Sequence, residues 1–314
     1  MGKGILSRRE APTEPSENSP APNEAFPRGP EGARCEEVSL ALIAREVGTP
    51  CYVYSSAGIR EQYAQLREAM GKLDARLHYS VKANSSISIL ALLRSLGAGL
   101  DIVSGGELYR ALKAGYNGED IVFSGVGKTE REMEEALRAE VLLFNVESEQ
   151  ELHVLEGVAK RLGVKAPVAL RVNPEVLVDT PHPYTRTGEK GMKFGIPFDE
   201  VLSVGKIAAT LPSIRLLGLD MHVGSQIFQF APYEVGLQRL LHLRRELERE
   251  SKIRLAYLDI GGGLAVTYDA ERSMDVGQFG KVITALVGGS GLKIILEPGR
   301  FLVGNAGEIG RAHV

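Results

Sequence analysis

Short apolar runs rich in β-branched residues alternate along the chain with amphipathic stretches of helical period. The eight runs with the length and composition of buried strands span residues 76–83, 99–104, 120–125, 142–146, 167–173, 216–223, 256–261 and 293–297. The clearest helical stretches between them span residues 87–96, 107–114, 130–139, 149–162 and 233–250. Thr129 with Glu132, and Ser148 with Glu151, have the spacing of a capping box at two helix starts.

Strict alternation of strand and helix predicts parallel strands joined by right-handed crossovers. Eight such units favour a closed (β/α)8 barrel over an open doubly wound sheet, so the fold class is α/β. We assign residues 56–307 to this barrel. The preceding segment, residues 38–55, ends in GTPCYVYS and is expected to supply a helix and a strand to another unit.

The two ends of the chain differ from its middle. Residues 1–37 are rich in Pro, Ser, Glu and Gly and have no hydrophobic period, so we expect a disordered tail. They contain neither the apolar core of a signal peptide nor the acid-poor composition of a transit peptide. Residues 308–314, EIGRAHV, match a translated sequencing adaptor. We expect them to be an artefact, which a DNA read across codon 307 would test.

Composition narrows the classes of function. The chain is 44% hydrophobic and 25% charged, as in ordinary soluble proteins, and no apolar run is long enough to cross a membrane. A net charge of −3 gives no electrostatic case for nucleic acid or an anionic membrane as a partner. Cys35 and Cys51 form neither a disulfide framework nor a metal-ligand pair, so we expect a reducing cytoplasm and no metal.

Active sites of such barrels lie at the carboxyl ends of the strands, and six of the eight predicted ends carry residues that are reactive or could bind an anion. These residues are Lys82, Asp101, Ser104, Arg171, His222, Ser225, Gly261, Gly262, Gly263, Glu297 and Arg300. Burial would lower the pKa of Lys82, and a neutral amine can form a Schiff base; the alternative is a surface lysine packed on the rim. The three glycines allow backbone amides to approach a phosphate, or they form a plain turn.

The remaining residues have two interpretations each. Glu297 can keep a pyridine nitrogen protonated and Arg300 can grip a substrate carboxylate, or the two form a rim salt bridge. His222 can stack on a flat cofactor, or it is an ordinary core histidine. A lysine, a histidine, a glycine turn and a glutamate with an arginine at one barrel mouth together suit a phosphorylated aromatic aldehyde cofactor.

Five segments resemble, in order, motifs of the barrel-type pyridoxal-phosphate decarboxylases of the alanine racemase/ornithine decarboxylase type. They are YSVKAN, DIVSGGEL, HVGSQI, LDIGGGL and EPGRFLVGNAG, within a resemblance that covers residues 38–307. GTPCYVYS, HVGSQ and PHPYTRTGEKGMKFGI (residues 181–196) are most similar to diaminopimelate decarboxylases. The resemblance implies pyridoxal 5′-phosphate as cofactor, and decarboxylation of meso-2,6-diaminopimelate to L-lysine and carbon dioxide.

The same resemblance implies a role for each residue. Lys82 forms the Schiff base with the cofactor and Asp101 lies beside it; His222 stacks on the cofactor ring and is catalytic together with Lys82. Glu297 pairs with the pyridine nitrogen, Arg171 supports the cofactor side of the pocket, and Arg300 binds a substrate carboxylate. The residues expected around the phosphate are Ser225, Gly261, Gly262, Gly263, Pro298, Gly299 and Arg300.

Members of this family continue into a β-rich domain that completes the substrate pocket, partly across a homodimer interface. Residues 38–55 are expected to belong to that domain, and no counterpart of its motifs follows residue 307. We therefore expect the chain on its own to be inactive and poorly soluble. Two alternatives stay open: a related decarboxylase of ornithine, arginine or a carboxy-polyamine, and a non-catalytic pyridoxal-phosphate-binding protein. An alanine-racemase-like enzyme fits EPGR and HVGSQ less well.

Overall fold

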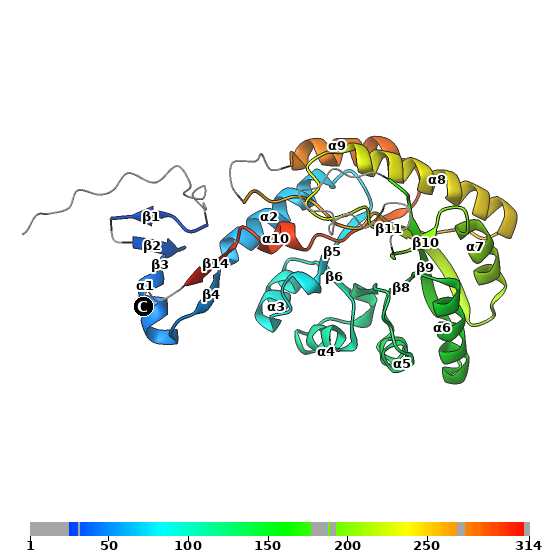
Figure 1. Ribbon diagram of the computed structural model, residues 1–314, viewed down its shortest axis with the longest axis horizontal. Coiled ribbons are helices and arrows are strands. Elements are labelled where there is room, and N and C mark those ends of the chain that lie inside the picture. The colour runs from blue at the N-terminus through cyan, green and yellow to red at the C-terminus, as the bar shows by residue number, and fades with distance from the viewer. Residues whose placement is uncertain (1–24, 31, 177–187, 189–192, 269–273, 311–314) are drawn as a thin grey trace, which may run out of the picture.

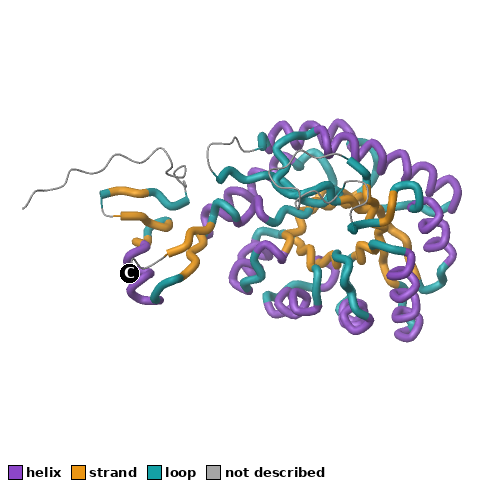
Figure 2. The backbone as a smooth tube through the Cα atoms, in the orientation of Figure 1, coloured by secondary structure: helices purple, strands orange, loops and turns teal. Residues whose placement is uncertain are grey.

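Parallel strands close into a ring surrounded by helices in the larger part of the molecule (Figures 1 and 2). The computed structural model describes residues 25–30, 32–176, 188, 193–268 and 274–310. In the described part of the chain the ring consists of β5 (Ala75–Ser80), β6 (Gly99–Ile102), β7 (Ile121–Phe123), β8 (Leu143–Val146), β9 (Ala166–Asn173), β11 (Ile214–Met221), β12 (Tyr257–Asp259) and β13 (Lys293–Leu296). β13 pairs with β5, and β8 with β9, so the ring is closed. The (β/α)8 prediction is confirmed.

Helices cover the outside of the ring (Figure 2). Those that the sequence pattern predicted are α3 (Ile87–Ser95), α4 (Gly105–Lys113), α5 (Glu130–Arg138), α6 (Glu149–Leu162) and α8 (Ala231–Ser251). Others are α2 (Ser56–Ala69), α7 (Val201–Thr210), α9 (Val276–Val287) and the short α10 (Arg300–Val303). The 3₁₀ turns η1 (Val81–Ala83) and η2 (Gly118–Asp120) flank strands, and β10 (Ile196–Pro197) extends β9.

The two predicted capping boxes have different outcomes. At the start of α5, the Thr129 hydroxyl accepts from the Glu132 amide, and the Glu132 carboxylate accepts from the Thr129 amide, as a complete capping box requires. At the start of α6, Ser148 accepts from the Glu151 amide, but the Glu151 carboxylate accepts from the Glu147 amide and from Lys128. The second box is therefore only half formed, because its carboxylate serves a buried lysine.

A small apolar layer formed by four strands supports the polar site above it. Val122, Leu143, Ala169 and Ile295 form a fully buried cluster separate from the main core. The residues two positions further along the chain are polar: Ser124, Asn145, Arg171 and Glu297. Side chains two apart on a strand point to the same face, so these polar side chains follow the apolar layer toward the carboxyl ends of the strands.

A smaller unit lies beside the barrel (Figure 1). β1 (Arg28–Gly29), β2 (Gly32–Cys35) and β3 (Val38–Ser39) form an antiparallel sheet, followed by α1 (Leu40–Val47) and β4 (Cys51–Tyr54). A helix and a strand were predicted for residues 38–55, and both are present. Residues 1–37 were expected to be disordered, but within that segment residues 28–29 and 32–35 form β1 and β2, which pair through backbone hydrogen bonds despite the polar composition. Residues 1–24 lie outside the described part of the chain.

β4 pairs antiparallel with β14 (Gly307–Gly310), which contains Glu308 and Ile309. Residues 311–314 lie outside the described part, and the interpretation of 308–314 as an artefact stays a prediction. Among the helices described, none combines the length and hydropathy required to span a bilayer.

Candidate active site

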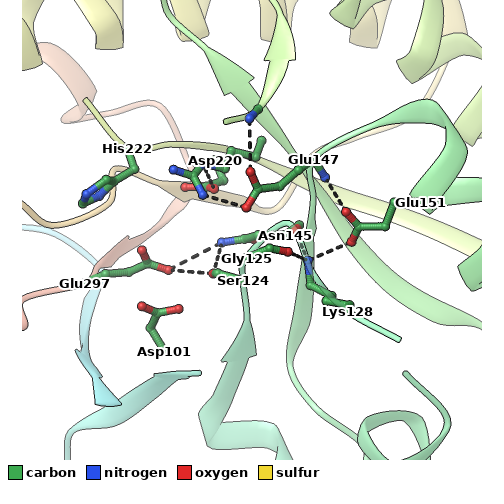
Figure 3. Close-up of polar contacts among 12 residues, drawn as sticks. Asp101, Ser124, Gly125, Lys128, Asn145, Glu147, Glu151, Asp220, His222 and Glu297 are labelled. Atoms are coloured by element: carbon green, nitrogen blue, oxygen red, sulfur yellow. Dashed lines mark hydrogen bonds and ion pairs between the residues drawn. The ribbon is translucent and has the colours of Figure 1, made fainter. Parts of the chain in front are cut away.

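Polar side chains from eight strand ends meet at the carboxyl end of the barrel. Figure 3 shows Glu297, Asn145 and Ser124 joined by hydrogen bonds, with Asp101, Asp220, His222 and Glu147 around them. The residues predicted for the site that contribute side chains to this group are Lys82, Asp101, Arg171, His222 and Glu297. We describe it first at Lys82, then at the buried carboxyl groups, and last at the glycine turn.

Lys82 follows β5 in the 3₁₀ turn η1 rather than in the strand itself. Its Nζ donates to Asp101 Oδ2 at 2.7 Å and to Ser80 Oγ at 3.2 Å. The Lys82 side chain is 50% exposed, whereas the Asp101 side chain is fully buried. Ser80 Oγ also donates to Asp101 Oδ2 at 2.7 Å, so two donors hold this carboxylate. The predicted pairing of Lys82 with Asp101 is present.

The electrostatics of Lys82 differ from the expectation. Burial acts to lower its pKa, but the carboxylates of Asp101 and Glu297 outweigh burial, and the pKa is raised above its ordinary value. The expectation of a depressed pKa was wrong in sign, because it considered the apolar strand and not the acid that faces it. Burial acts to raise the pKa of Asp101, but the adjacent Lys82 ammonium and several hydrogen bonds lower it below its usual range.

Glu297 lies buried at the end of β13. Its Oε1 accepts from Ser124 Oγ at 3.4 Å and from Asn145 Nδ2 at 3.5 Å. Burial, followed by the negative charge of Asp101, raises the pKa of Glu297 to about 7. Glu297 is therefore poised between its ionised and neutral forms at physiological pH. A positive partner at its carboxyl group would favour ionisation.

Two aspartates missed by the sequence analysis adjoin Glu297. Asp220 precedes Met221, the last residue of β11, and Asp259 is the last residue of β12. Both are buried. Carboxylate oxygens of Asp220, Asp259 and Glu297 all lie within 4.8 Å of one another. Burial and the neighbouring Glu297 raise the pKa values of both aspartates well above the ordinary value.

Arg171 on β9 is buried and pairs with Glu147, which follows β8. Its NH1 lies 2.7 Å from Glu147 Oε1, and its Nε lies 3.8 Å from Asp220 Oδ2. The guanidinium also lies over the Phe194 ring, 5.1 Å from the centroid. Arg171 therefore lies in the predicted pocket as part of an internal ion pair, and Glu147 is the partner that sequence reasoning missed.

His222 follows β11, and its Nδ1 accepts a hydrogen bond from the Gly262 amide at 3.2 Å. Burial lowers the pKa of His222 to about 3, assisted by the positive charges of Arg171 and Lys82. The imidazole is therefore neutral at physiological pH. The bond at Nδ1 fixes both its tautomer and the orientation of its ring. His222 is thus a fixed, uncharged, flat group beside the glycine turn.

The turn after β12 requires glycine at three consecutive positions. A Cβ would lie 2.4 Å from Met221 O at Gly261, 2.0 Å from Glu297 O at Gly262 and 2.3 Å from Gly224 O at Gly263. Gly261 and Gly263 also have positive φ values, 67° and 100°. The turn thus packs against the backbone of both neighbouring strand ends, and any side chain here would displace them.

Two of the three glycine amides are already bound within the protein. The Gly261 amide donates to Asp259 Oδ1 at 3.0 Å and the Gly262 amide to His222 Nδ1 at 3.2 Å. Both amides therefore already have acceptors within the protein, and the role of the three glycines in holding a phosphate stays a prediction. The Gly263 carbonyl accepts from the Ile227 amide at 2.9 Å, which brings the loop containing Ser225 against the turn.

Pro298, Gly299 and Arg300 continue from β13 into α10. The Pro298 carbonyl accepts from the Ser80 amide at 3.2 Å, so this segment lies directly beside the Lys82 turn. Arg300 is exposed, and its NH1 donates to the Tyr268 hydroxyl. No ion pair joins Arg300 to Glu297 among the residues described, so the rim salt bridge is not the arrangement found. Arg300 is instead open to solvent at the mouth.

Sequence reasoning missed six polar residues of the site: Ser80, Ser124, Asn145, Glu147, Asp220 and Asp259. Two of them carry a recognisable signal. Ser124 and Asn145 stand two positions after Val122 and Leu143 of the inner apolar layer. A polar residue in that position identifies a site-facing side chain once the inner face is known. Most of residues 181–196, the TG…KFG stretch, lies outside the described part of the chain.

Comparison with known proteins supplies independent information. Residues 56–304 match the family described as "Pyridoxal-dependent decarboxylase, pyridoxal binding domain". The diaminopimelate decarboxylase of Pseudomonas aeruginosa is 47% identical over 274 residues, which cover 87% of this chain and 66% of that protein. The chain thus spans slightly less than two thirds of the length of this relative.

Two solved structures show how the fold compares. The crystal structure of diaminopimelate decarboxylase from Helicobacter pylori complexed with L-lysine has a TM-score of 0.83 and 36% identity, covering 86% of this chain and 68% of that chain. Lysine decarboxylase from Selenomonas ruminantium has a TM-score of 0.74 and 29% identity, covering 86% of this chain and 67% of that chain. Both the structural and the sequence similarity are greater to the diaminopimelate enzyme.

Proposed function

Because the chain belongs to the pyridoxal-dependent decarboxylase family, we propose that it binds pyridoxal 5′-phosphate at the barrel mouth and that the whole protein decarboxylates meso-2,6-diaminopimelate to L-lysine and carbon dioxide. The observation that carries this proposal is the convergence of Lys82, Glu297 and the glycine turn at one end of the barrel. The 47% identity to a diaminopimelate decarboxylase supports the substrate.

The residues present fit the cofactor. Gly261, Gly262 and Gly263 leave out the three Cβ atoms that would collide with the neighbouring backbone, and this keeps the turn close to His222 and Glu297. Asp101 Oδ1 is buried and receives no hydrogen bond from any described residue, so the carboxylate facing Lys82 has spare acceptor capacity. A bound pyridoxal 5′-phosphate supplies an electron sink for the electron pair that a departing carboxylate leaves behind.

The chain's own groups then have distinct tasks. The Lys82 ammonium must lose a proton before its nitrogen can bond to an aldehyde carbon, and Asp101 Oδ2 is the acceptor within reach at 2.7 Å. Glu297, with a pKa of about 7, would accept a hydrogen bond from a protonated ring nitrogen, and that positive partner would favour its ionised form. Neutral His222 presents the face of its ring, oriented by the Gly262 amide.

Other residues bind the remaining charges. Arg300 is exposed at the mouth and supported by Tyr268, so its guanidinium is available to a substrate carboxylate. Arg171 neutralises Glu147 within the wall of the pocket. We assign phosphate binding to Ser225, to the turn at Gly263 and to the backbone from Pro298 onward, which lie around the same opening.

The setting and assembly form part of the proposal. The similarity to a bacterial diaminopimelate decarboxylase supports a cytoplasmic location for the protein. A homodimer of the whole protein would supply the remainder of the substrate pocket. Decarboxylation of ornithine, arginine or a carboxy-polyamine is the second candidate, and the lower similarity to a lysine decarboxylase disfavours it.

Capture of the cofactor by Lys82 tests the proposal. The chain is incubated with pyridoxal 5′-phosphate, reduced with borohydride, digested and analysed by mass spectrometry. We expect a phosphopyridoxyl group on Lys82, its loss in Lys82→Ala, and its retention in Lys113→Ala, which removes an exposed lysine on α4. Labelling spread equally over surface lysines would overturn the assignment.

The substrate is tested on the same complex. We expect the absorbance of the bound cofactor to change with meso-2,6-diaminopimelate at lower concentrations than with L-ornithine or L-arginine. An equal response to ornithine would favour the second candidate. Arg300→Ala should weaken the response to every amino acid that depends on carboxylate binding, while leaving the label on Lys82.

A further inference from the structure

Three carboxyl groups meet at the ends of adjacent strands with too little positive charge between them. Asp220, Asp259 and Glu297 end or directly follow β11, β12 and β13, and each is at least 95% buried. Their oxygens lie within 4.8 Å of one another. Three negative charges this close in a buried site would repel each other strongly. An arrangement with all three ionised is therefore unfavourable.

The nearby cations are already paired with other acids. Lys82 Nζ lies 2.7 Å from Asp101 Oδ2, and Arg171 NH1 lies 2.7 Å from Glu147 Oε1. Within the described part of the chain, the only ion pair that reaches the three carboxyl groups joins Arg171 Nε to Asp220 Oδ2, at 3.8 Å. Five carboxyl groups thus share two cations, and the imbalance falls on the three that lie together.

The same region also has too few hydrogen-bond donors. Asp220 Oδ1 and Asn145 Oδ1 are buried, and neither receives a hydrogen bond within the described part of the chain. The Asn145 side chain points into the cluster, since its Nδ2 donates to Asp259 Oδ2 at 3.1 Å and to Glu297 Oε1 at 3.5 Å. Buried acceptors without donors are costly. A proton on a carboxyl oxygen removes both the excess charge and part of the donor deficit.

We propose that Asp220, Asp259 and Glu297 hold a shared proton in the folded protein, that Asp259 carries it, and that Asp259 thereby acts as a positioning residue for Glu297. Among the residues described, Asp259 is the acid of the three that has no ion-pair partner: its hydrogen-bond donors are the Gly261 amide and the Asn145 amide group. Asp220 has Arg171, and Glu297 faces Lys82 across the mouth. A protonated Asp259 can donate to Glu297, which leaves the negative charge on Glu297. The use of that charge toward a pyridine nitrogen rests on the proposed function.

Other titratable groups surround the three carboxyl groups and contribute to the pH dependence of stability. Asp101 and Lys82 face it from the β5–β6 side, Glu147 and Arg171 from β8 and β9, and His222 from the end of β11. Burial and Glu297 raise the pKa of Asp259, so the folded state binds its proton more tightly than the unfolded state does. The stabilisation is complete below the unfolded pKa of 3.8 and is lost as the pH rises through the folded pKa.

Infrared spectroscopy tests the proton directly. We expect the wild-type chain at neutral pH to show the carbonyl stretch of a protonated, buried carboxyl group. Asp259→Asn should abolish this band. Asp220→Asn, which removes a neighbour but not the proton, and Asp101→Asn, which removes an ionised carboxylate, should both retain it. Absence of the band in the wild type, or its survival in Asp259→Asn, would overturn the proposal, and the wild-type measurement requires no variant to fold.

Stability supplies a second measurement. Above the unfolded pKa, the unfolding equilibrium constant of the wild type should rise relative to that of Asp259→Asn by about tenfold per pH unit. Titrating groups outside the cluster are common to both proteins and cancel in the ratio. A ratio that stays independent of pH above the unfolded pKa of 3.8 contradicts the assignment. Both measurements use the protein without cofactor, so failure of Lys82 capture would refute the proposed function and leave this inference standing.

Discussion

Lys128 offers a sharp test of how the site is held in shape (Figure 3). Its Nζ donates to Gly125 O at 2.7 Å, to Asn145 O at 2.8 Å and to Glu151 Oε1 at 2.7 Å. The Lys128 side chain is 0% exposed and that of Glu151 only 10%. Glu151 Oε2 in turn accepts from the Glu147 amide. One buried ammonium therefore ties the loop after β7 to the strand end that carries Asn145 and Glu147.

The cost of replacing Lys128 by Met follows from these contacts. Each hydrogen bond made by a charged group contributes about 1.5–3 kcal/mol, so three give a gross loss of roughly 4.5–9 kcal/mol. The variant no longer has to desolvate an ammonium, which offsets part of that loss. Removing one partner of a buried ion pair typically costs about 3–5 kcal/mol, and we expect Lys128→Met to lower the free energy of unfolding by this amount.

Urea unfolding at constant pH measures this loss. The matched control is Arg161→Met, which breaks an ion pair with Glu130 whose side chains are 56% and 62% exposed, and should cost less than about 1 kcal/mol. Glu151→Gln combined with Lys128→Met should cost less than the sum of the single changes by about 1–3 kcal/mol. A Lys128→Met effect no larger than that of Arg161→Met would refute the reasoning.

Three further predictions can be checked on the same protein. Thr129→Ala should lose about 1 kcal/mol of unfolding free energy because it removes the α5 cap, whereas Ser86→Ala, whose hydroxyl makes no cap bond, should not. Gly262→Ala should abolish cofactor capture because its Cβ would lie 2.0 Å from Glu297 O; Gly157→Ala, with open space around it in α6, should stabilise by about 0.5–1 kcal/mol. Burial lowers the folded pKa of His78 to about 4 from 6.5, so stability is lost as the pH falls below 6.5. In His78→Gln this acid slope should shrink by about 1.4 kcal/mol per pH unit in urea titrations.

Continuous apolar runs were sufficient to predict the barrel, because its strands are largely buried on both faces. Runs such as 167–173 and 293–297 could be assigned for that reason, and their order along the chain required parallel pairing. The strands around residues 28–35 escaped prediction because they are short, exposed and mostly polar. These strands are defined by backbone hydrogen bonds, which do not require a particular amino-acid composition.

Site residues could be predicted where the residue type is unusual at the end of a strand. They were missed where a common polar residue joins the site only because of the residues that surround it in the fold. Lys82 and the three glycines are conspicuous in a sequence; Asn145 and Asp259 are not. The sign of the Lys82 pKa was wrong for the same reason, because Asp101 outweighs burial only when both lie at one barrel mouth. Proximity between strand ends supplies what a linear pattern cannot.

The pairing of β4 with β14 determines when the smaller unit can be completed. These strands come from nearly opposite ends of the chain, so they can meet only after the intervening barrel has brought its two ends together. Closing so long a loop in the unfolded chain carries a large entropic cost, which the folded barrel removes. We therefore expect β4 and β14 to pair late in folding, and during synthesis β4 stays without this partner until residues 307–310 have left the ribosome.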